Sequence, residues 1–242
     1  AVSSAQTPLV MLNNKYIFWV LSPLPEEEFS LDITNKEHPT LLCVGNAPTI
    51  KEAVSPAISC IGSVLMSQMN NPGKATSVFM VDEFPTILLQ GIDTFIGTAR
   101  KHNVSTILAV QDFNQAVRDY GEKSANILKA SCGTQAYGMT GNEKTAKDIE
   151  NLFGEQKEAQ ESFSQQEGGG NSRTESLQKE KVLKAREVAG QSAGHFIGKI
   201  AGGKPPFFNV QMNMCKFEEK EIPPFSLPVK LASGNELSLI HI

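Results

Sequence analysis

The sequence predicts an α/β fold in which helices cover both faces of a mostly parallel sheet. Short apolar runs alternate with stretches whose apolar residues recur at helical spacing, from about residue 15 to residue 153. These runs are nearly continuous rather than alternating with polar residues, which is typical of parallel strands buried on both faces. With 242 residues, of which 40% are hydrophobic, the chain is long enough to bury a substantial core.

Two strands and a helix are predicted before the most informative motif. The strands are residues 16–21, which are rich in aromatic and β-branched side chains, and the apolar run 41–45. The helix begins either at Thr49, within a capping box, or at Ser55, which precedes a proline, and both starts remain open. It ends at residues 70–73, where Asn-Asn-Pro-Gly breaks the pattern.

A buried strand that delivers two adjacent carboxylates is the most informative feature of the chain. Residues 78–83 read Val-Phe-Met-Val-Asp-Glu, so the apolar run ends on Asp82 and Glu83. In open α/β sheets, ligands bind outside the carboxyl ends of the strands. There the first carboxylate can hold Mg²⁺ through water, and the second can orient or deprotonate an attacking water. The alternative is that the two acids only begin a solvated loop. Arg100 and Gln111, which follow them, make this alternative less favoured.

Two further polar residues occupy positions that suit nucleotide chemistry. Arg100 lies near the end of a helix expected at 92–102, and a second apolar run, 105–110, ends on Gln111. A glutamine there offers a neutral group that can sense a γ-phosphate. Because sequential parallel strands usually lie side by side, we expect Gln111 and the two acids to converge at one edge of the sheet, within roughly 10 Å.

Beyond Gln111 the predicted elements continue to alternate until a polar, glycine-rich stretch interrupts them. Residues 155–175 consist mainly of Gln, Glu, Ser and Gly, which leaves nothing to bury and predicts a flexible linker. The other predicted elements are a polar helical region up to residue 130, a strand at 134–139, a helix capped by Gly141-Asn142 and ending at Phe153, a charged helix at 177–188, and edge strands at 195–200 and 207–212 added to the main sheet.

One stretch matches a phosphate-binding loop and is rejected. Gly198 to Lys204 fits G-x-x-x-x-G-K, but the eighth position, which should be Ser or Thr at a helix start, is Pro205, followed by Pro206. Proline supplies neither a hydroxyl for Mg²⁺ nor a backbone N–H for phosphate. We interpret this stretch as a hairpin turn and expect the true phosphate-binding loop to lie upstream of Ala1.

Composition narrows the class of function. The net charge of −4 gives no global basic field, so any DNA contact must come from a local patch or from a channel formed by several subunits. The four cysteines and four histidines show no ligand or pairing spacing, which predicts a reduced compartment and no structural zinc. The chain opens without Met and ends in an unpatterned run, so we expect a piece of a longer protein with a non-native tail at 231–242.

Several motifs in a fixed order carry a resemblance to a known family. They are Val78–Glu83, Thr98-Ala-Arg100-Lys-His-Asn, Ile107–Gln111-Asp-Phe, Cys132-Gly-Thr-Gln and Leu152-Phe-Gly154, with outlying matches at 18–22, 41–46, 175–180 and 194–199. Together they resemble the TraG/TraD type IV coupling proteins, and more closely the versions in conjugative elements of Bacteroides-like bacteria. The resemblance covers about residues 15 to 212. It implies a RecA-like P-loop NTPase core whose phosphate-binding loop is missing from this chain.

The resemblance also implies domains and cofactors. Residues 1–154 would form the second half of the ATPase domain on the Walker B side, and residues 176–230 would complete the same domain after the linker at 155–175. The implied cofactors are ATP and Mg²⁺.

The family's site residues carry over to four positions. Asp82 would be the Walker B carboxylate that holds Mg²⁺ through water, Glu83 would activate the attacking water, and Gln111 would sense the γ-phosphate. Arg100 would be an arginine finger that reaches the nucleotide of a neighbouring subunit, because a planar, permanently charged guanidinium suits that task. The open alternative for Arg100 is a solvated residue at a helix end. No role is assigned to Lys101.

The function that the resemblance implies is an ATP hydrolase subunit of a homo-hexamer that pumps relaxase-bound single-stranded DNA into a type IV secretion channel. It would work at the cytoplasmic face of the bacterial inner membrane, anchored by a segment absent from this chain, and the chain alone would be inactive. Two alternatives stay open: a RecA-like hexameric ATPase that moves a protein substrate or drives secretion assembly, and a non-catalytic module that docks relaxase. Basic residues at 118, 123 and 129 alternate with acids and do not decide between DNA and protein.

Overall fold

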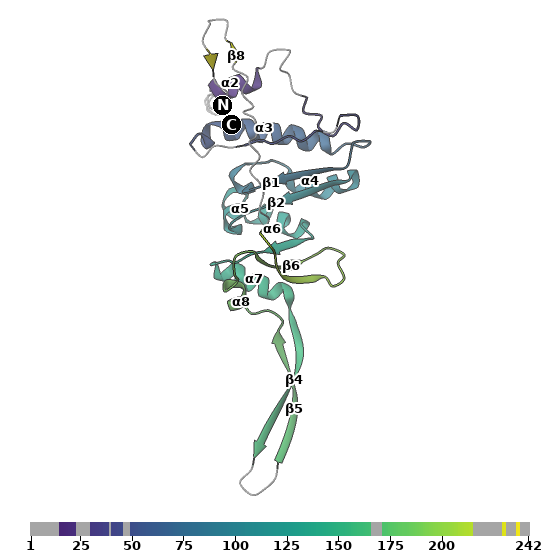
Figure 1. Cartoon of the computed structure of the whole chain (residues 1–242), viewed down its shortest axis with the longest axis vertical. Helices are drawn as coiled ribbons and strands as arrows, with labels where there is room; N and C mark the ends of the chain where they lie inside the picture. Colours follow the sequence, from purple (N-terminus) through teal and green to yellow (C-terminus); the bar gives the residue numbers. More distant parts are fainter. Residues whose placement is uncertain are drawn as a thin grey trace. The chain divides into compact units, whose positions relative to one another are not determined.

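The computed structural model describes residues 15–22, 30–38, 40–45, 49–165, 171–214, 229–230 and 236–237 (Figure 1). It divides into two compact units, one of residues 1–131 with 217–242 and one of residues 132–216. The division falls at Ser131, rather than at the predicted linker, and the assignment of both units to one ATPase domain stays a prediction. Most of the predicted tail at 231–242 lies outside the described residues.

The first unit alternates helices and parallel strands (Figure 1). Its elements are α2 (Lys15–Leu21), α3 (Lys51–Met69), β1 (Ser77–Val81), the short 3₁₀ helix η2 (Phe84–Thr86), α4 (Ile92–Ala99), the 3₁₀ helix η3 (Arg100–His102), β2 (Val104–Leu108), α5 (Phe113–Tyr120), α6 (Glu122–Ser131), β8 (Val229–Lys230) and β9 (Glu236–Leu237). In the described part of the chain, none of the helices combines the length and the apolar character needed to cross a membrane.

Strands β1 and β2 form a parallel pair, as predicted. Their register runs from Ser77 opposite Val104 to Val81 opposite Leu108, and α4 makes the connection between them. One face of this pair packs into the core. There Phe79 is 9% exposed and its ring contacts the ring of Phe95 on α4, with centroids 5.4 Å apart. The crossover helix therefore covers this face of the strands.

In the described part of the chain, the opposite face of the same strand pair is exposed. Val78 is 60% exposed, Met80 is 64% exposed and Ile107 is 47% exposed. The register places Met80 opposite Ile107, so these side chains form one apolar patch rather than scattered exposures. The strands have the composition of a sheet buried on both faces, and the described residues bury only one.

The predicted elements before β1 need three corrections. Residues 16–21 lie in helix α2 rather than in a strand, and residues 41–45 have no regular structure. Leu41 is 88% exposed, whereas Leu42 packs against the hydrophobic core of the first unit. Helix α3 begins at Lys51 with Ile50 at its N-cap and without a capping side chain, so neither predicted start is right. It ends at Asn70, as predicted.

The second unit contains an antiparallel sheet rather than an extension of the parallel one. Its elements are β3 (Gln135–Tyr137), α7 (Glu143–Phe153), β4 (Glu155–Gln165), β5 (Asn171–Lys181), α8 (Ala185–Ala189), β6 (His195–Lys199) and β7 (Phe207–Gln211). The sheet order is β3-β6-β7, and both pairings are antiparallel. The predicted strands exist, but the prediction that they join the main parallel sheet is wrong. Gly198 is required in β6, because an added Cβ would meet the carbonyl oxygen of Gln135 at 2.0 Å.

A long hairpin occupies the region predicted as a flexible linker. Strands β4 and β5 pair antiparallel over eleven residues each, from Glu155 opposite Lys181 to Gln165 opposite Asn171 (Figure 1). The charged helix predicted over 177–188 shortens to α8, since its first part belongs to β5. Backbone pairing needs no apolar side chains, so a prediction based on burial alone missed the hairpin.

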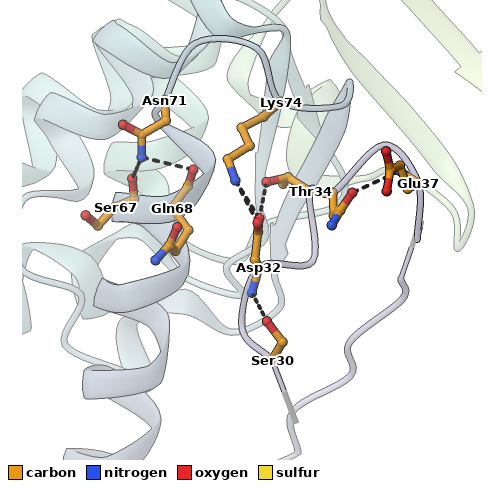
Figure 2. Close-up of polar contacts among 9 residues, drawn as sticks. Ser30, Asp32, Thr34, Glu37, Ser67, Gln68, Asn71 and Lys74 are labelled. Carbon is orange, nitrogen blue, oxygen red and sulfur yellow. Dashed lines mark hydrogen bonds and ion pairs between the residues drawn. The ribbon is translucent and has the colours of Figure 1, made fainter.

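An ion pair holds the segment before α3 against the approach to β1. Lys74 Nζ lies 2.8 Å and 2.7 Å from the two carboxylate oxygens of Asp32, and the Thr34 hydroxyl donates to the same carboxylate at 3.3 Å (Figure 2). The backbone N–H of Ala75 donates to the carbonyl of Thr34, whose side chain is 1% exposed. The segment that carries Asp32 is thereby fastened two residues ahead of β1.

The ion pair predicts a pH-dependent stability. The hydrogen-bonded Lys74 ammonium lowers the pKa of Asp32, so the folded-state pKa lies below the unfolded value of about 3.9. A depressed carboxylate pKa stabilises the fold above the unfolded pKa, and this stabilisation is lost as the pH falls through the folded pKa. We expect Asp32→Asn to lower the urea midpoint at pH 7, with the gap to wild type closing below about pH 4.

Glu37→Gln is the matched control, since it removes a carboxylate of the same segment. The contact of Glu37 in Figure 2 comes from its backbone N–H, which donates to Asn35 Oδ1 at 2.9 Å, so the substitution leaves it in place. It should leave the urea midpoint unchanged across the same pH range. A gap between Asp32→Asn and wild type that is the same at pH 3 and pH 7 would contradict the assignment.

Candidate functional site

The parallel register brings the acidic pair and Gln111 together at the carboxyl ends of the strands. Gln111 Nε2 donates a hydrogen bond to Glu83 Oε1 at 2.6 Å. Two backbone hydrogen bonds extend the strand pairing to this point, from Ala109 N to the Val81 carbonyl at 2.9 Å and from Phe84 N to the Ala109 carbonyl at 3.1 Å. The predicted convergence of Glu83 and Gln111 at one edge is confirmed as geometry.

The backbone at Glu83 sets the direction of its side chain. Glu83 lies in the left-handed region, with φ 48° and ψ 44°. A residue other than glycine pays about 1–2 kcal/mol for this conformation, so surrounding contacts must hold it. Its own N–H donates to Asp82 Oδ1 at 3.0 Å, and the next residue, Phe84, is 3% exposed and anchored to the core. The turn therefore presents the Glu83 carboxylate outward from the strand edge.

Asp82 has the chemistry for a hard cation. One of its oxygens accepts the Glu83 N–H, and the other makes no contact with the described residues. Among those residues there is no group of three or more His, Cys, Asp or Glu side chains that could hold a metal ion. Mg²⁺ typically uses one or two carboxylates and completes its shell with water and phosphate oxygens. A single free carboxylate oxygen at a ligand edge fits that pattern.

The structure does not bring Arg100 to the same edge. Arg100 opens η3, whose end at Asn103 leads directly into β2, and the Asn103 carbonyl accepts the N–H of Ser77 at the start of β1. Arg100 therefore lies by the amino ends of both strands, whereas Glu83 lies beyond their carboxyl ends. Strands of five residues with a rise of about 3.3 Å separate the two ends by about 13 Å. Arg100 is exposed.

Sequence reasoning missed two residues that shape the site. Asp112 caps α5, its side chain accepting the N–H of Asn114 at 2.9 Å, and it directly follows Gln111. An Asp one residue ahead of a helical pattern is a local signal that could have found it. Tyr120, at the end of α5, bonds to the turn after Glu83, and this contact between distant positions has no sequence signal.

The stretch that matches G-x-x-x-x-G-K has the geometry predicted for a hairpin turn. It runs from Gly198 in β6 into the loop that returns as β7, and the two strands are antiparallel. A phosphate-binding loop joins a strand to a helix N-terminus, whereas this loop joins two strands. Pro205 and Pro206 are exposed in it. The rejection of this motif is confirmed.

Comparison with known proteins gives one family-model match and several similar solved structures. Residues 76–192 match the family model described as the TraM recognition site of TraD and TraG. The bacterial conjugative coupling protein TrwBdeltaN70, in its unbound monoclinic form, is similar with a TM-score of 0.59 and 21% identity over 70% of this chain and 39% of that chain. Its trigonal form in complex with sulphate gives 0.64 and 19%, covering 80% and 45%. The plasmid coupling protein TrwB in complex with ADP and Mg²⁺ gives 0.58 and 20%, covering 72% and 40%. A search of curated proteins found no match.

These likenesses show the fold. The chain holds part of an α/β fold like that of the TrwB coupling proteins, with the parallel pair β1-β2 in its first unit. The family-model match and the structural matches confirm the resemblance stated from the sequence motifs. The chain covers only 39% to 45% of the TrwBdeltaN70 chains it resembles, so it spans less than half of their length.

The helix cap beside Gln111 gives a stability prediction. Asp112→Ala leaves the N–H of Asn114 without its side-chain acceptor, and we expect a loss of about 1 kcal/mol in the free energy of unfolding, measured by urea denaturation. Asp112→Asn keeps a side-chain oxygen at the same place and should stay within a few tenths of a kcal/mol of wild type. Equal losses in both variants would show that charge, rather than the cap hydrogen bond, matters here.

Proposed function

We propose that this chain, which contains the C-terminal part of a TraG/TraD-type conjugative coupling protein, supplies the hydrolytic half of an ATPase site. The observation that carries the proposal is the contact between Glu83 and Gln111 at the carboxyl ends of two parallel strands. A nucleotide in an open α/β sheet binds at that edge. ATP and Mg²⁺ are the proposed cofactors, supported by the solved TrwB in complex with ADP and Mg²⁺.

Each residue at this edge has a separate task in the proposed site. The Glu83 carboxylate accepts a proton from, or orients, the water that attacks the γ-phosphorus. Gln111 holds the same carboxylate through its amide N–H, so a γ-phosphate that attracts the amide would change the position of the glutamate. The free oxygen of Asp82 would hold Mg²⁺ through water. Bound Mg²⁺ supplies charge neutralisation to the phosphates.

Arg100 acts on a neighbouring subunit in this proposal. It lies at the opposite end of the strands from Glu83, so the two residues do not share one nucleotide within a subunit. An exposed arginine at that position suits an arginine finger that stabilises the charge of phosphoryl transfer across an interface. This assignment rests on an oligomer, and a homo-hexamer is the proposed assembly.

The proposed substrate is single-stranded DNA bound to relaxase, delivered to a type IV secretion channel from the cytoplasmic face of the inner membrane. The description of the matched family names a TraM recognition site, which supports docking of a relaxosome protein. Two of the three basic side chains of α5 and α6 are already engaged, because Arg118 is paired with Asp119 at 2.6 Å and Lys129 Nζ lies 5.1 Å from the ring centroid of Phe113. These helices therefore give DNA little support. A motor that moves a protein is the alternative outcome of the substrate test.

The 242-residue chain by itself is expected to lack turnover, because its one match to G-x-x-x-x-G-K runs into Pro205. The decisive test therefore uses the full-length protein. Glu83→Gln should lower ATP turnover by about 10²- to 10⁴-fold, as the loss of a general base does. ATP affinity should change by less than about twofold, because Glu83 acts on water and not on the nucleotide.

Glu122→Gln is the control, since it removes an exposed carboxylate at the start of α6 in the same unit and should leave turnover unchanged. Steady-state hydrolysis and nucleotide binding are measured for both variants. Wild-type turnover in Glu83→Gln would refute the proposed role of the acidic pair.

Action in trans is tested by mixing variants of the full-length protein. Arg100→Ala should cost on the order of 10³ in turnover, as arginine-finger losses do. Mixing it with Glu83→Gln should restore some activity, because some interfaces then pair an intact finger with an intact glutamate. Lys101→Ala removes the adjacent exposed cation and should keep wild-type turnover. No recovery at any ratio, with mixed hexamers demonstrated, would rule out action across the interface.

A further inference from the structure

The hydroxyl of Tyr120 makes two hydrogen bonds to the segment that follows Glu83. The backbone N–H of Leu89 donates to it at 3.0 Å, and it donates to the Ile87 carbonyl at 2.6 Å. The ring is half-buried, and burial raises the pKa of the Tyr120 hydroxyl, so the group stays protonated and can donate at neutral pH. A neutral hydroxyl that both accepts and donates satisfies two backbone groups of one loop at once.

The ring of Tyr120 contacts the same segment closer to Glu83. Its centroid lies 5.5 Å from that of Phe84, the residue directly after Glu83. The turn that begins at Glu83 is short, and its first hydrogen bond runs from Thr86 N to the Glu83 carbonyl at 2.8 Å. Tyr120 therefore holds both ends of the turn whose first carbonyl belongs to Glu83. Such contacts are what a non-glycine residue needs to remain in the left-handed region.

Gln111, the partner of Glu83 in the site, lies just before the helix that carries Tyr120. Helix α5 extends from Phe113 to Tyr120, and its N-cap, Asp112, is bonded in sequence to Gln111. Helix α5 therefore begins next to Gln111 and ends at Tyr120, which holds the turn after Glu83. The 2.6 Å contact between Glu83 and Gln111 depends on both ends keeping their places.

We propose that Tyr120 is a positioning residue for the proposed ATPase: its hydroxyl fixes the turn after Glu83 to α5 and so keeps the carboxylate aimed at the attacking water. Without the hydroxyl, Leu89 N–H and the Ile87 carbonyl lose their partner, and the strained backbone at Glu83 can relax. Turnover then falls while nucleotide binding persists, because a displaced carboxylate no longer meets the water in the productive geometry. This inference rests on the proposed function.

The test uses Tyr120→Phe in the full-length protein, which keeps the ring and removes only the hydroxyl. We expect kcat for ATP hydrolysis to fall about tenfold and KM to change by less than about twofold. In a Gln111→Ala background, where the glutamate has already lost its partner, the same substitution should lower kcat by less than about threefold. Tyr137→Phe is the matched control, since Tyr137 is a half-buried tyrosine of the second unit whose hydroxyl donates to Gln135 Oε1 at 2.6 Å. It should keep wild-type kcat.

The outcomes separate this inference from the proposed function. A wild-type protein that does not hydrolyse ATP overturns the proposed function, whereas an active wild type with unchanged kcat in Tyr120→Phe overturns only the role of Tyr120. An undiminished loss in the Gln111→Ala background, or an equal loss in Tyr137→Phe, also overturns it, because each indicates a general effect on folding. Should Tyr120→Phe not fold, Phe84→Leu weakens the contact with the Tyr120 ring while keeping an apolar side chain in the core, and wild-type kcat in that variant counts against the inference.

Discussion

The parallel register between β1 and β2 is the constraint on which the candidate site depends. Because Val81 stands opposite Leu108, the chain leaves both strands at the same level. Two further backbone hydrogen bonds continue the pairing toward Glu83 and Gln111, whose side chains then meet. A slip of one residue would send every side chain of one strand to the other face. Packing of Phe79 and Val81 in the core opposes that slip, so hydrophobic burial on one face sets the geometry of the polar groups at the edge.

The same topology separates Arg100 from the carboxylates of Asp82 and Glu83. A crossover must return the chain to the amino end of the sheet before the second parallel strand can begin, and α4 with η3 is that return. Arg100 sits at its end. The acids therefore lie at one end of the strand pair and the arginine at the other. In the proposed ATPase, one nucleotide would contact both only at an interface between copies.

Local signals explain which elements could be predicted from the sequence. The strand that ends on Glu83 and the helix capped by Asn142 were predictable because the informative residues are neighbours in the chain, and the Asn142 side chain accepts the N–H of Thr145 as a cap should. The pairing of β3 with β6 and the contact of Tyr120 with Ile87 join positions far apart, and no periodicity encodes them. Residues 16–21 show the reverse case, in which strand propensity gives way to context.

The open face of the strand pair bears on the chemistry at its edge. Val78, Met80 and Ile107 keep 47% to 64% of their surface in water, although parallel strands are almost always covered on both sides. Glu83 and Gln111 are also exposed, so their hydrogen bond competes with water and contributes little by itself. Covering the apolar face would remove water from the adjoining edge, and each polar contact there would strengthen as the local dielectric falls. Packing on the open face would therefore also strengthen the polar contacts of the proposed ATPase site, because both lie on the same two strands.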